Sequence, residues 1–173
     1  MNIEDEIQRP LSGEEMKQTA KNMNLNIKII LYNDLYKYKT LDELFNACKN
    51  IIILYRWADR MGHWVALFKS GDYIEFFEPY GTPPDALKKE IDKTFLKTSG
   101  QQPDYIKKLL LLYDNKNINY NNYKLQKKGD VNTCGRHCLV RLMYSDYNID
   151  EYKKIFKNIN PDLYVVLFTS YFN

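Results

Sequence analysis

The fold is organised around the stretch Asn132-Thr133-Cys134-Gly135-Arg136-His137-Cys138-Leu139. It follows a turn-like approach at residues 128–132 and leads into an apolar run, Cys138 to Tyr144, that is typical of a buried helix. A cysteine in front of such a helix feels the positive end of the helix dipole and unpaired backbone N–H groups, and both favour the thiolate. The stretch therefore predicts a nucleophile at Cys134 or, in the simpler interpretation, a small core residue.

Length and composition indicate an ordinary globular domain. We expect residues 1–173 to form a single domain, with residues 1–10 as an extended arm. The net charge of +3 is too small to indicate nucleic acid by itself. Residues 4–6 are acidic where a secretion signal would be basic, and no apolar run approaches the ~20 residues of a membrane helix. The three cysteines lack the spacing of a disulfide framework. We therefore expect neither secretion nor membrane insertion.

The hydrophobic pattern predicts a helix, a strand and a short helix, then a strand meander, then further helices. Ser12 with Glu15, and Thr40 with Glu43, form capping boxes in front of the two early helices. The expected strands are 26–32, 51–56, 62–69, 73–78 and 123–126; the expected helices are 13–23, 41–48, 84–97, 106–113, 138–144 and two last ones capped by Asp150 and Asn160; residues 114–122 are an expected loop. This order predicts an α+β fold with helices flanking a central, mostly antiparallel sheet.

A cysteine nucleophile needs a base and a group that orients the base, and the chain has two histidines. His137 follows Cys134 on the same helix, where a separate carboxylate could hardly orient it. His63 lies on a predicted strand, which is a more rigid mount, and Trp64 could pack beside its imidazolium. The turn at 70–72 returns Glu78 close to His63, so the hairpin allows a His63–Glu78 pair. Taken alone, each of these residues is more commonly structural.

Four short motifs together resemble one family of proteases. They are Gly62-His63-Trp64, Phe76-Phe77-Glu78-Pro79-Tyr80-Gly81, Gln126 and Asn132-Thr133-Cys134-Gly135. In this order they resemble the adenovirus-type maturation proteases and their relatives, the SUMO-specific proteases. The branch found in large DNA viruses and virophages is the most similar.

The resemblance implies a papain-like core in permuted order, with the nucleophile at the N-terminus of a buried helix. It implies Cys134 as the nucleophile, His63 as the general base and then acid, and Glu78 as the residue that orients His63. We expect the surroundings of the substrate and the oxyanion to include Trp64, Asn132 and Gly135.

The resemblance also implies an oxyanion hole made of the Gln126 side-chain amide and the backbone N–H of Cys134. Gln126 lies eight positions before Cys134, whereas family members often have a slightly shorter gap. Residues 127–132 would have to absorb the extra residue, and Asn132 is the second candidate for the donor.

For function, the resemblance implies a monomeric viral maturation endopeptidase whose partner is a polypeptide, a capsid or virion precursor. The expected location is the virion, the infected cell's cytoplasm or the virus factory. No cofactor is expected, although adenovirus-type enzymes can use DNA and a peptide. Lysines cluster, as they commonly do on solvated helix faces, so nucleic-acid binding is only a secondary expectation. The clustered lysines are Lys88, Lys89, Lys93, Lys97, Lys107, Lys108, Lys124, Lys127 and Lys128.

Two alternatives follow from the same residues. The site would also serve an isopeptidase that removes a ubiquitin-like modifier, although the compact chain favours a groove for an extended peptide. Bacterial acetyltransferase effectors share the His, Glu and Cys, without a sign here of a coenzyme site. A non-enzymatic alternative is a zinc module using Cys134, His137 and Cys138, for which only Cys48 could complete four ligands. In the simpler interpretation Cys138 lies in the helix core and His137 on its surface.

Overall fold

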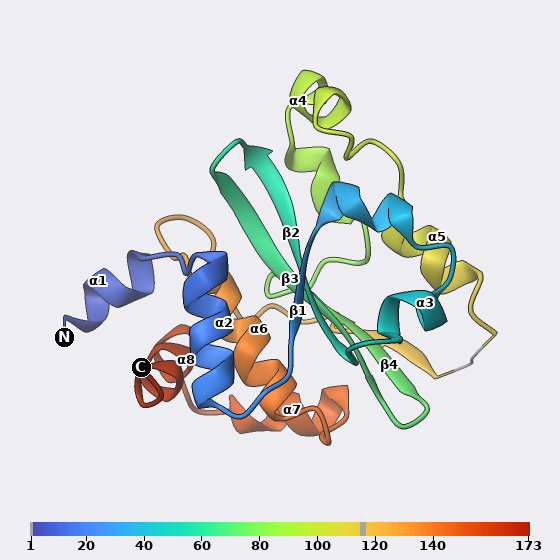
Figure 1. Ribbon diagram of the computed structural model, residues 1–173. Helices are drawn as coiled ribbons and strands as arrows, with labels where there is room; N and C mark the ends of the chain where they lie inside the picture. Colours follow the sequence, from blue (N-terminus) through green and yellow to red (C-terminus); the bar gives the residue numbers. More distant parts are fainter. Residues whose placement is uncertain (1, 115–116) are drawn as a thin grey trace.

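A five-stranded sheet runs through the centre of the computed structural model, which describes residues 2–114 and 117–173 (Figure 1). Its order is β1-β2-β3-β4-β5, with antiparallel pairing from β2 to β4 and parallel pairing at both edges. The strands are β1 (Lys28–Leu31), β2 (Asn50–Ala58), β3 (Met61–Ser70), β4 (Tyr73–Phe77) and β5 (Ile118–Tyr120). The α+β class is confirmed, with an antiparallel meander at the centre of a mixed sheet.

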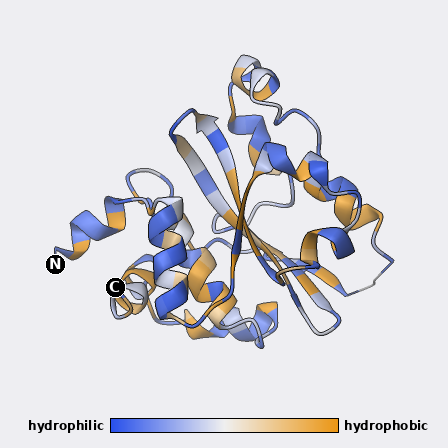
Figure 2. Ribbon diagram, viewed as in Figure 1, coloured by the Kyte–Doolittle hydropathy of each residue, from blue (hydrophilic) through white to orange (hydrophobic). Residues whose placement is uncertain are grey.

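Two helical layers cover the two faces of this sheet (Figure 1). The first layer contains α2 (Gly13–Asn22), α6 (Cys134–Met143), α7 (Ile149–Ile155) and α8 (Pro161–Ser170), and the second contains the 3₁₀ helix η1 (Tyr32–Lys37), α3 (Leu41–Phe45) and α5 (Tyr105–Leu111). Side chains of β3 alternate between the layers: Ala66 and Phe68 pack toward α6, while Val65 and Leu67 pack toward α3 and α5. Apolar colour therefore concentrates along the strands and the inner helix faces (Figure 2).

Residues 2–9 do not form the expected extended arm. Asn2 accepts a hydrogen bond from Glu4 N and caps α1 (Ile3–Gln8), whose acidic first turn suits the positive end of the helix dipole. The helix packs against α8, near the C-terminus of the chain (Figure 1). The N-terminal segment is thus part of the folded domain.

The single helix expected at 84–97 is two shorter segments, the 3₁₀ helix η2 (Ala86–Glu90) and α4 (Lys93–Thr98). Asp85 has a left-handed backbone (φ 64°), and its buried carboxylate accepts hydrogen bonds from the Tyr32 hydroxyl and from Lys107 N. Ile91 is extended and buried, and the next residue, Asp92, caps α4. These tertiary contacts override the four-residue repeat that predicted a continuous helix.

The last expected strand lies elsewhere. Residues 123–126 form no strand, whereas β5 lies inside the segment 114–122 that was expected to be a loop. Part of that segment, residues 115–116, lies outside the described residues. Ile118 of β5 pairs with Ile74 of β4, so pairing with the sheet gives this polar segment a strand conformation.

Helix caps follow the sequence more closely. Ser12 and Glu15 form the expected capping box, and Asn160 caps α8 as expected. The cap of α7 is Asn148 rather than Asp150, and Glu151 completes its box. The side chain of Asn148 accepts from two backbone N–H groups, which fixes the helix start two residues earlier than expected.

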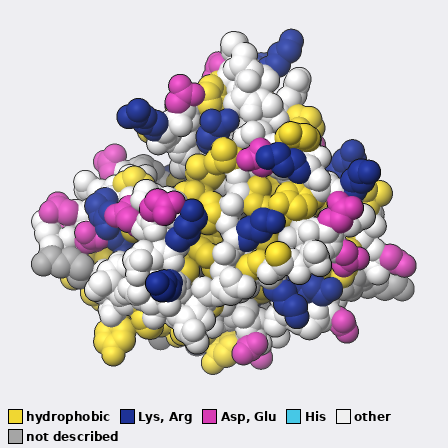
Figure 3. Space-filling model, viewed as in Figure 1, with side chains coloured by type: hydrophobic (Ala, Val, Ile, Leu, Met, Phe, Trp, Pro, Cys, Tyr) yellow, Lys and Arg dark blue, Asp and Glu magenta, His cyan; other side chains and the backbone are white. Residues whose placement is uncertain are grey.

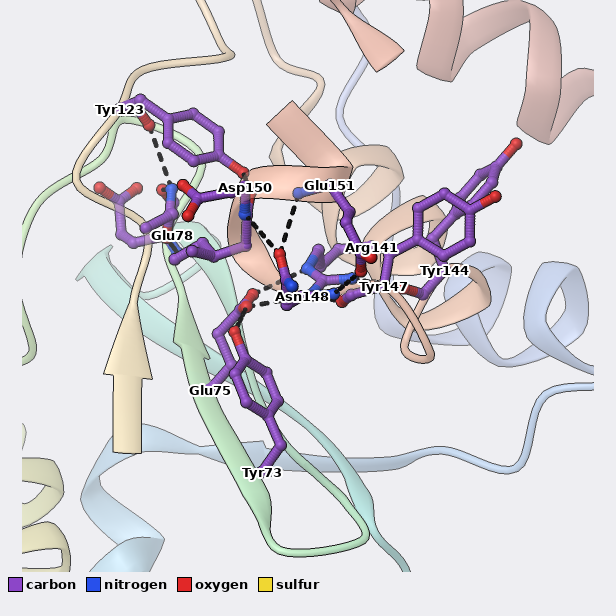
Figure 4. Close-up of polar contacts among 12 residues, drawn as sticks. Tyr73, Glu75, Glu78, Tyr123, Arg141, Tyr144, Tyr147, Asn148, Asp150 and Glu151 are labelled. Atoms are coloured by element: carbon purple, nitrogen blue, oxygen red, sulfur yellow. Dashed lines mark hydrogen bonds and ion pairs between the residues drawn. The ribbon is translucent and has the colours of Figure 1, made fainter. Parts of the chain in front are cut away.

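A fully buried ion pair ties α6 to β4 (Figure 4). Arg141 Nε and Nη2 donate to the two carboxylate oxygens of Glu75 at 2.7 and 2.9 Å. The Tyr73 hydroxyl donates to the same carboxylate at 2.5 Å, and the guanidinium lies over the rings of Phe68 and Tyr152. This pair holds the helix that begins with Cys134 in one position on the sheet.

Candidate active site

The imidazole of His63 lies between the sulfur of Cys134 and the carboxylate of Glu78. Its Nε2 is 2.5 Å from Glu78 Oε1, which leaves Nδ1 for the side-chain hydrogen bond with Cys134. The three side chains are buried, with exposed fractions of 6% for Cys134, 2% for His63 and 0% for Glu78. Folding therefore brings together the three residues that the motifs pointed to.

The hairpin of β3 and β4 explains why His63 and Glu78 meet. Continuing its register beyond the Ala66–Phe77 pair places Glu78 across from Val65, on the same face as His63 and diagonal to it. Gly62, in front of His63, has no room for a Cβ atom, because the Tyr55 carbonyl and the Leu54 side chain lie against it. The glycine thus lets β2 approach β3 closely beside the histidine.

The Glu78 carboxylate is held by four donors. Tyr80 N lies 2.9 Å from Oε1, next to His63 Nε2, while the backbone N and hydroxyl of Thr82 lie 3.0 and 2.7 Å from Oε2. Asn121, which follows β5, bonds both the backbone N and the backbone O of Glu78. Burial raises the pKa of Glu78, but the hydrogen bonds and the charge of His63 outweigh this and hold that pKa below its usual value. The carboxylate is therefore ionised and fixed in orientation.

Two aromatic rings flank His63, and neither is Trp64. The Tyr80 ring stacks on the imidazole with centroids 4.6 Å apart, and the Trp57 ring lies 6.0 Å away. Successive residues of a strand face opposite sides, so the Trp64 indole points toward the α6 layer and donates to the Leu11 carbonyl at 3.0 Å. The expectation that this indole packs beside His63 was wrong. The backbone N–H of Trp64 instead donates to the Cys134 sulfur.

Cys134 is the first residue of α6, as expected for a thiol at a helix N-terminus. Gly135 follows it because a Cβ atom there would lie 3.0 Å from Met16 Sδ and 3.2 Å from the Trp64 ring. The backbone N–H groups of Trp64 and Gly135 both donate to the Cys134 sulfur. These donors and the helix dipole favour a negative charge on the sulfur.

Cys134 and His63 stabilise each other in charged form. Burial raises the pKa of Cys134, yet the charge and hydrogen bond of His63 outweigh it, and the pKa of the thiol is lowered. Burial disfavours the imidazolium, but the charge and hydrogen bond of Cys134, together with Glu78, raise the pKa of His63 to about 9. The two shifts both favour a thiolate beside an imidazolium.

A pH dependence of alkylation follows from these shifts. We expect the alkylation of Cys134 by iodoacetamide to reach its plateau at a lower pH than that of an ordinary thiol, because the pKa of Cys134 is lowered. As pH falls through the lowered pKa of Cys134 the rate should drop; above about 9, where His63 loses its proton, peptide turnover should drop while alkylation persists. Mass spectrometry of samples quenched at successive times measures the alkylation rate at each pH, and cleavage of a peptidyl-coumarin measures turnover. An alkylation rate that climbs about tenfold per pH unit from neutral to alkaline pH, as for an ordinary thiol, would contradict it.

Gln126 lies at the edge of the site, with its amide partly engaged. The backbone N–H groups of Leu125 and Gln126 donate to the Pro79 carbonyl, which anchors the segment next to Tyr80. Gln126 Nε2 donates to the Val131 carbonyl at 2.8 Å and lies 3.5 Å from the Tyr80 hydroxyl. An amide nitrogen has two hydrogens, so one remains for a stronger acceptor than the distant hydroxyl.

Asn132, the second candidate for the oxyanion donor, is hydrogen-bonded to the N-terminal segment. Its backbone N donates to the Ile7 carbonyl at 2.9 Å and its side-chain nitrogen to the Gln8 carbonyl at 2.7 Å. Its amide therefore ties the cysteine turn to the end of α1. The role of Asn132 as an oxyanion donor stays a prediction.

Two further buried polar residues near the nucleophile escaped the sequence analysis. Arg136 is fully buried, donates to Thr169 Oγ1 at 2.8 Å and forms an ion pair with Glu6 of α1. Asp162 of α8 is 2% exposed, and its Oδ1 lies 3.0 Å from His137 Nε2. The apolar residues of α6 are spread over most of its circumference, and this was the available signal that the helix is enclosed.

The expected surface position of His137 was wrong, since the side chain is fully buried. The ligand set of the zinc alternative is not assembled: Cys134 contacts His63, His137 contacts Asp162, and Cys138 lies in the apolar core. Over residues 2–114 and 117–173, no three His, Cys, Asp or Glu side chains form a group that could hold a metal ion.

Four of the clustered lysines, Lys88, Lys89, Lys93 and Lys107, line one pocket that also contains Asp85 and Asp104. Lys88 is buried and donates to the carbonyls of Gln102 and Pro103, and Lys128 pairs with Glu90. Figure 3 shows Lys and Arg side chains interspersed with Asp and Glu rather than gathered in one band on this face. Activation by DNA stays a prediction. Among the described residues, no helix has the length and apolar character needed to span a membrane.

Comparison with known proteins finds a clear relative. No family model matches the chain. It is 37% identical over 150 residues to the uncharacterized protein V9 of Sputnik virophage, an alignment covering 82% of this chain and 85% of that protein. The chain therefore belongs to the same family as the virophage V9 protein.

Similar solved structures show much lower identity. One is the C-terminal Ulp1 protease domain in complex with Smt3, the yeast ortholog of SUMO (TM-score 0.41, 13% identity, 94% of this chain and 77% of that chain). Another is ChlaDub1 from Chlamydia trachomatis (TM-score 0.36, 15% identity, 99% of this chain and 77% of that chain). At these TM-scores, function has to be inferred from this chain's own site.

Proposed function

We propose that the protein is a cysteine peptidase that uses Cys134 as nucleophile, His63 as general base and acid, and Glu78 to orient His63. The observation that carries this proposal is the buried, continuous chain from the Cys134 sulfur through His63 to the ionised Glu78. The packing of the fold does not need a buried ion pair between Cys134 and His63, so the pair is better explained by catalysis. A thiolate held beside an imidazolium at a helix N-terminus is an arrangement that suits acyl transfer.

The chemistry follows from the resting charges. The Cys134 thiolate attacks a peptide or isopeptide carbonyl, and the resulting oxyanion collapses as His63 gives its proton to the leaving amine. His63 then takes a proton from water, which attacks the thioester and releases the carboxylic acid and the thiolate. Glu78 keeps the imidazole in one orientation and stabilises its positive charge throughout.

The oxyanion would be bound by the backbone N–H of Cys134 and by the free hydrogen of the Gln126 amide. The bond from Gln126 to the Val131 carbonyl fixes the plane of that amide, and the stacked Tyr80 keeps solvent from the imidazole face. Losing one positioned oxyanion donor typically costs ~3 kcal/mol of transition-state stabilisation. Gln126 therefore belongs to the proposed site with the three residues above.

The natural substrate that we propose is a virion precursor polypeptide, cleaved by a monomer in the virus factory or the assembling particle. Support comes from the virophage relative. The compact single domain favours an extended peptide over a large folded modifier.

A substrate panel tests this proposal. The wild-type protein is incubated with candidate capsid precursors, a positional library of peptidyl-coumarins, and a ubiquitin-like modifier joined to coumarin. We expect cleavage of the precursors and peptides. Protein alkylated by iodoacetamide is the blank, with mass spectrometry locating the label on Cys134 rather than on Cys138, whose pKa is raised by burial. Exclusive cleavage of the modifier would identify a deconjugase instead, and no cleavage in any arm would contradict the peptidase proposal.

A further inference from the structure

One buried carboxylate joins the two halves of the proposed oxyanion hole. Asp162 Oδ1 accepts from the Thr133 hydroxyl at 2.5 Å and lies 3.0 Å from His137 Nε2, while its Oδ2 accepts from Lys127 N at 3.1 Å. Thr133 precedes Cys134, and Lys127 follows Gln126. The carboxylate therefore contacts both neighbours of the two groups that would bind the oxyanion.

These contacts close a loop at its base. Residues 127–132 are mostly exposed, and Gly129 has a backbone φ of 103° that favours glycine. Asp162 holds the two ends of this loop, and the Gln126–Val131 hydrogen bond crosses it. The exposed loop 127–132 therefore has its two ends fixed to one buried side chain.

We infer that Asp162, supported by His137, is a positioning residue that sets the distance between the Gln126 amide and the backbone N–H of Cys134. The inference rests on the proposed peptidase function. Burial lowers the pKa of His137, so its ring stays neutral, donates Nε2–H to Asp162 and adds no positive charge beside His63. Asp162 itself touches neither the sulfur nor the substrate, because its oxygens are taken up by the loop and the helix.

The test separates the oxyanion hole from the thiolate. Asp162→Asn removes the negative charge and replaces one acceptor oxygen with an NH₂ that accepts no hydrogen bond. The Thr133 and His137 contacts then survive only if the hydroxyl and the imidazole Nε2 both become acceptors, and the charge-assisted bonds that close the loop are weakened. We expect kcat on a peptidyl-coumarin selected with the wild type to fall between about tenfold and a hundredfold. The affinity of the matching peptide aldehyde, whose adduct carries an oxyanion, should fall by a similar factor. Alkylation of Cys134 by iodoacetamide needs no oxyanion hole and should stay within about twofold of the wild-type rate.

Two further variants complete the experiment. Thr133→Val keeps the shape of the side chain, loses one bond to Asp162 and should show a smaller loss in the same two readouts. It decides the question if Asp162→Asn does not fold. Asp146→Asn, at an exposed site, is the matched control and should equal the wild type.

The outcomes are distinguishable. Unchanged turnover and aldehyde affinity in Asp162→Asn would overturn the inference, and so would alkylation that slows by the same factor as turnover, because Asp162 would then act on the thiolate or the fold. Wild-type protein that cleaves nothing in the substrate panel refutes the proposed function, and the inference with it. Wild-type cleavage with an unimpaired variant refutes the inference alone.

Discussion

Replacing His63 with alanine is expected to lower kcat/KM by about 10⁴-fold or more, the loss seen when a member of a catalytic triad is removed. Two causes add. The general acid is missing, and Cys134 keeps the burial that raises its pKa without the imidazolium that lowers it. The alkylation rate of Cys134 should therefore also fall at neutral pH and recover only in alkaline solution. Rates of peptidyl-coumarin cleavage and of iodoacetamide labelling measure the two effects.

Matched variants make this result specific. Cys134→Ala should lose turnover completely and lose the labelled peptide, while Lys69→Ala, at the far end of the same strand, should equal the wild type. His63→Ala protein that keeps wild-type turnover, or that labels as fast as wild type at neutral pH, would remove His63 from the mechanism.

Replacing Arg141 with alanine should cost about 3–5 kcal/mol in the free energy of unfolding, because it leaves Glu75 charged and buried without its partner. The guanidinium also donates to the carbonyls of Tyr144 and Tyr147 at the end of α6, which would lose their donor. Such a loss is a large share of the roughly 5–15 kcal/mol that stabilises an ordinary domain. Urea denaturation followed by circular dichroism measures it.

The control is Arg60→Ala, at the exposed turn between β2 and β3, which should change stability by less than ~0.5 kcal/mol. Replacing both buried partners, Arg141→Met with Glu75→Leu, should recover much of the loss, because no unpaired charge then remains. A loss below about 1 kcal/mol in Arg141→Ala would show that water reaches Glu75 and that the pair is not the support of α6.

The hairpin and the helix after Cys134 were accessible from local patterns, whereas the catalytic roles came from the resemblance of the four motifs. A turn nearly midway between His63 and Glu78 brings them to one end of a hairpin, and a glycine and an apolar run after Cys134 indicate a helix start. The same alternation of strand residues would have placed the Trp64 indole correctly, on the side opposite His63.

Other parts of the site were beyond local patterns. Asp162 lies 25 residues from His137, on another helix, and only the packing of α8 against α6 brings them together. The six residues of α1 are too few for a hydrophobic stripe to be recognised, although Asn2 and the acidic first turn marked its start. Contacts between segments that are distant in the chain produce no periodic pattern in a single sequence, so they could not be predicted from it.

The docking of α1 has a consequence for a chain truncated at its N-terminus. A protein shortened to begin at Pro10 would keep His63, Glu78, Gln126 and Cys134, and every strand that carries them. It would nevertheless lose the Glu6 carboxylate that pairs with the buried guanidinium of Arg136. Asn132 would also lose the Ile7 and Gln8 carbonyls, and water would have to accept its two hydrogen bonds instead. Competence of the nucleophile would then depend on nine residues that contain none of the catalytic groups.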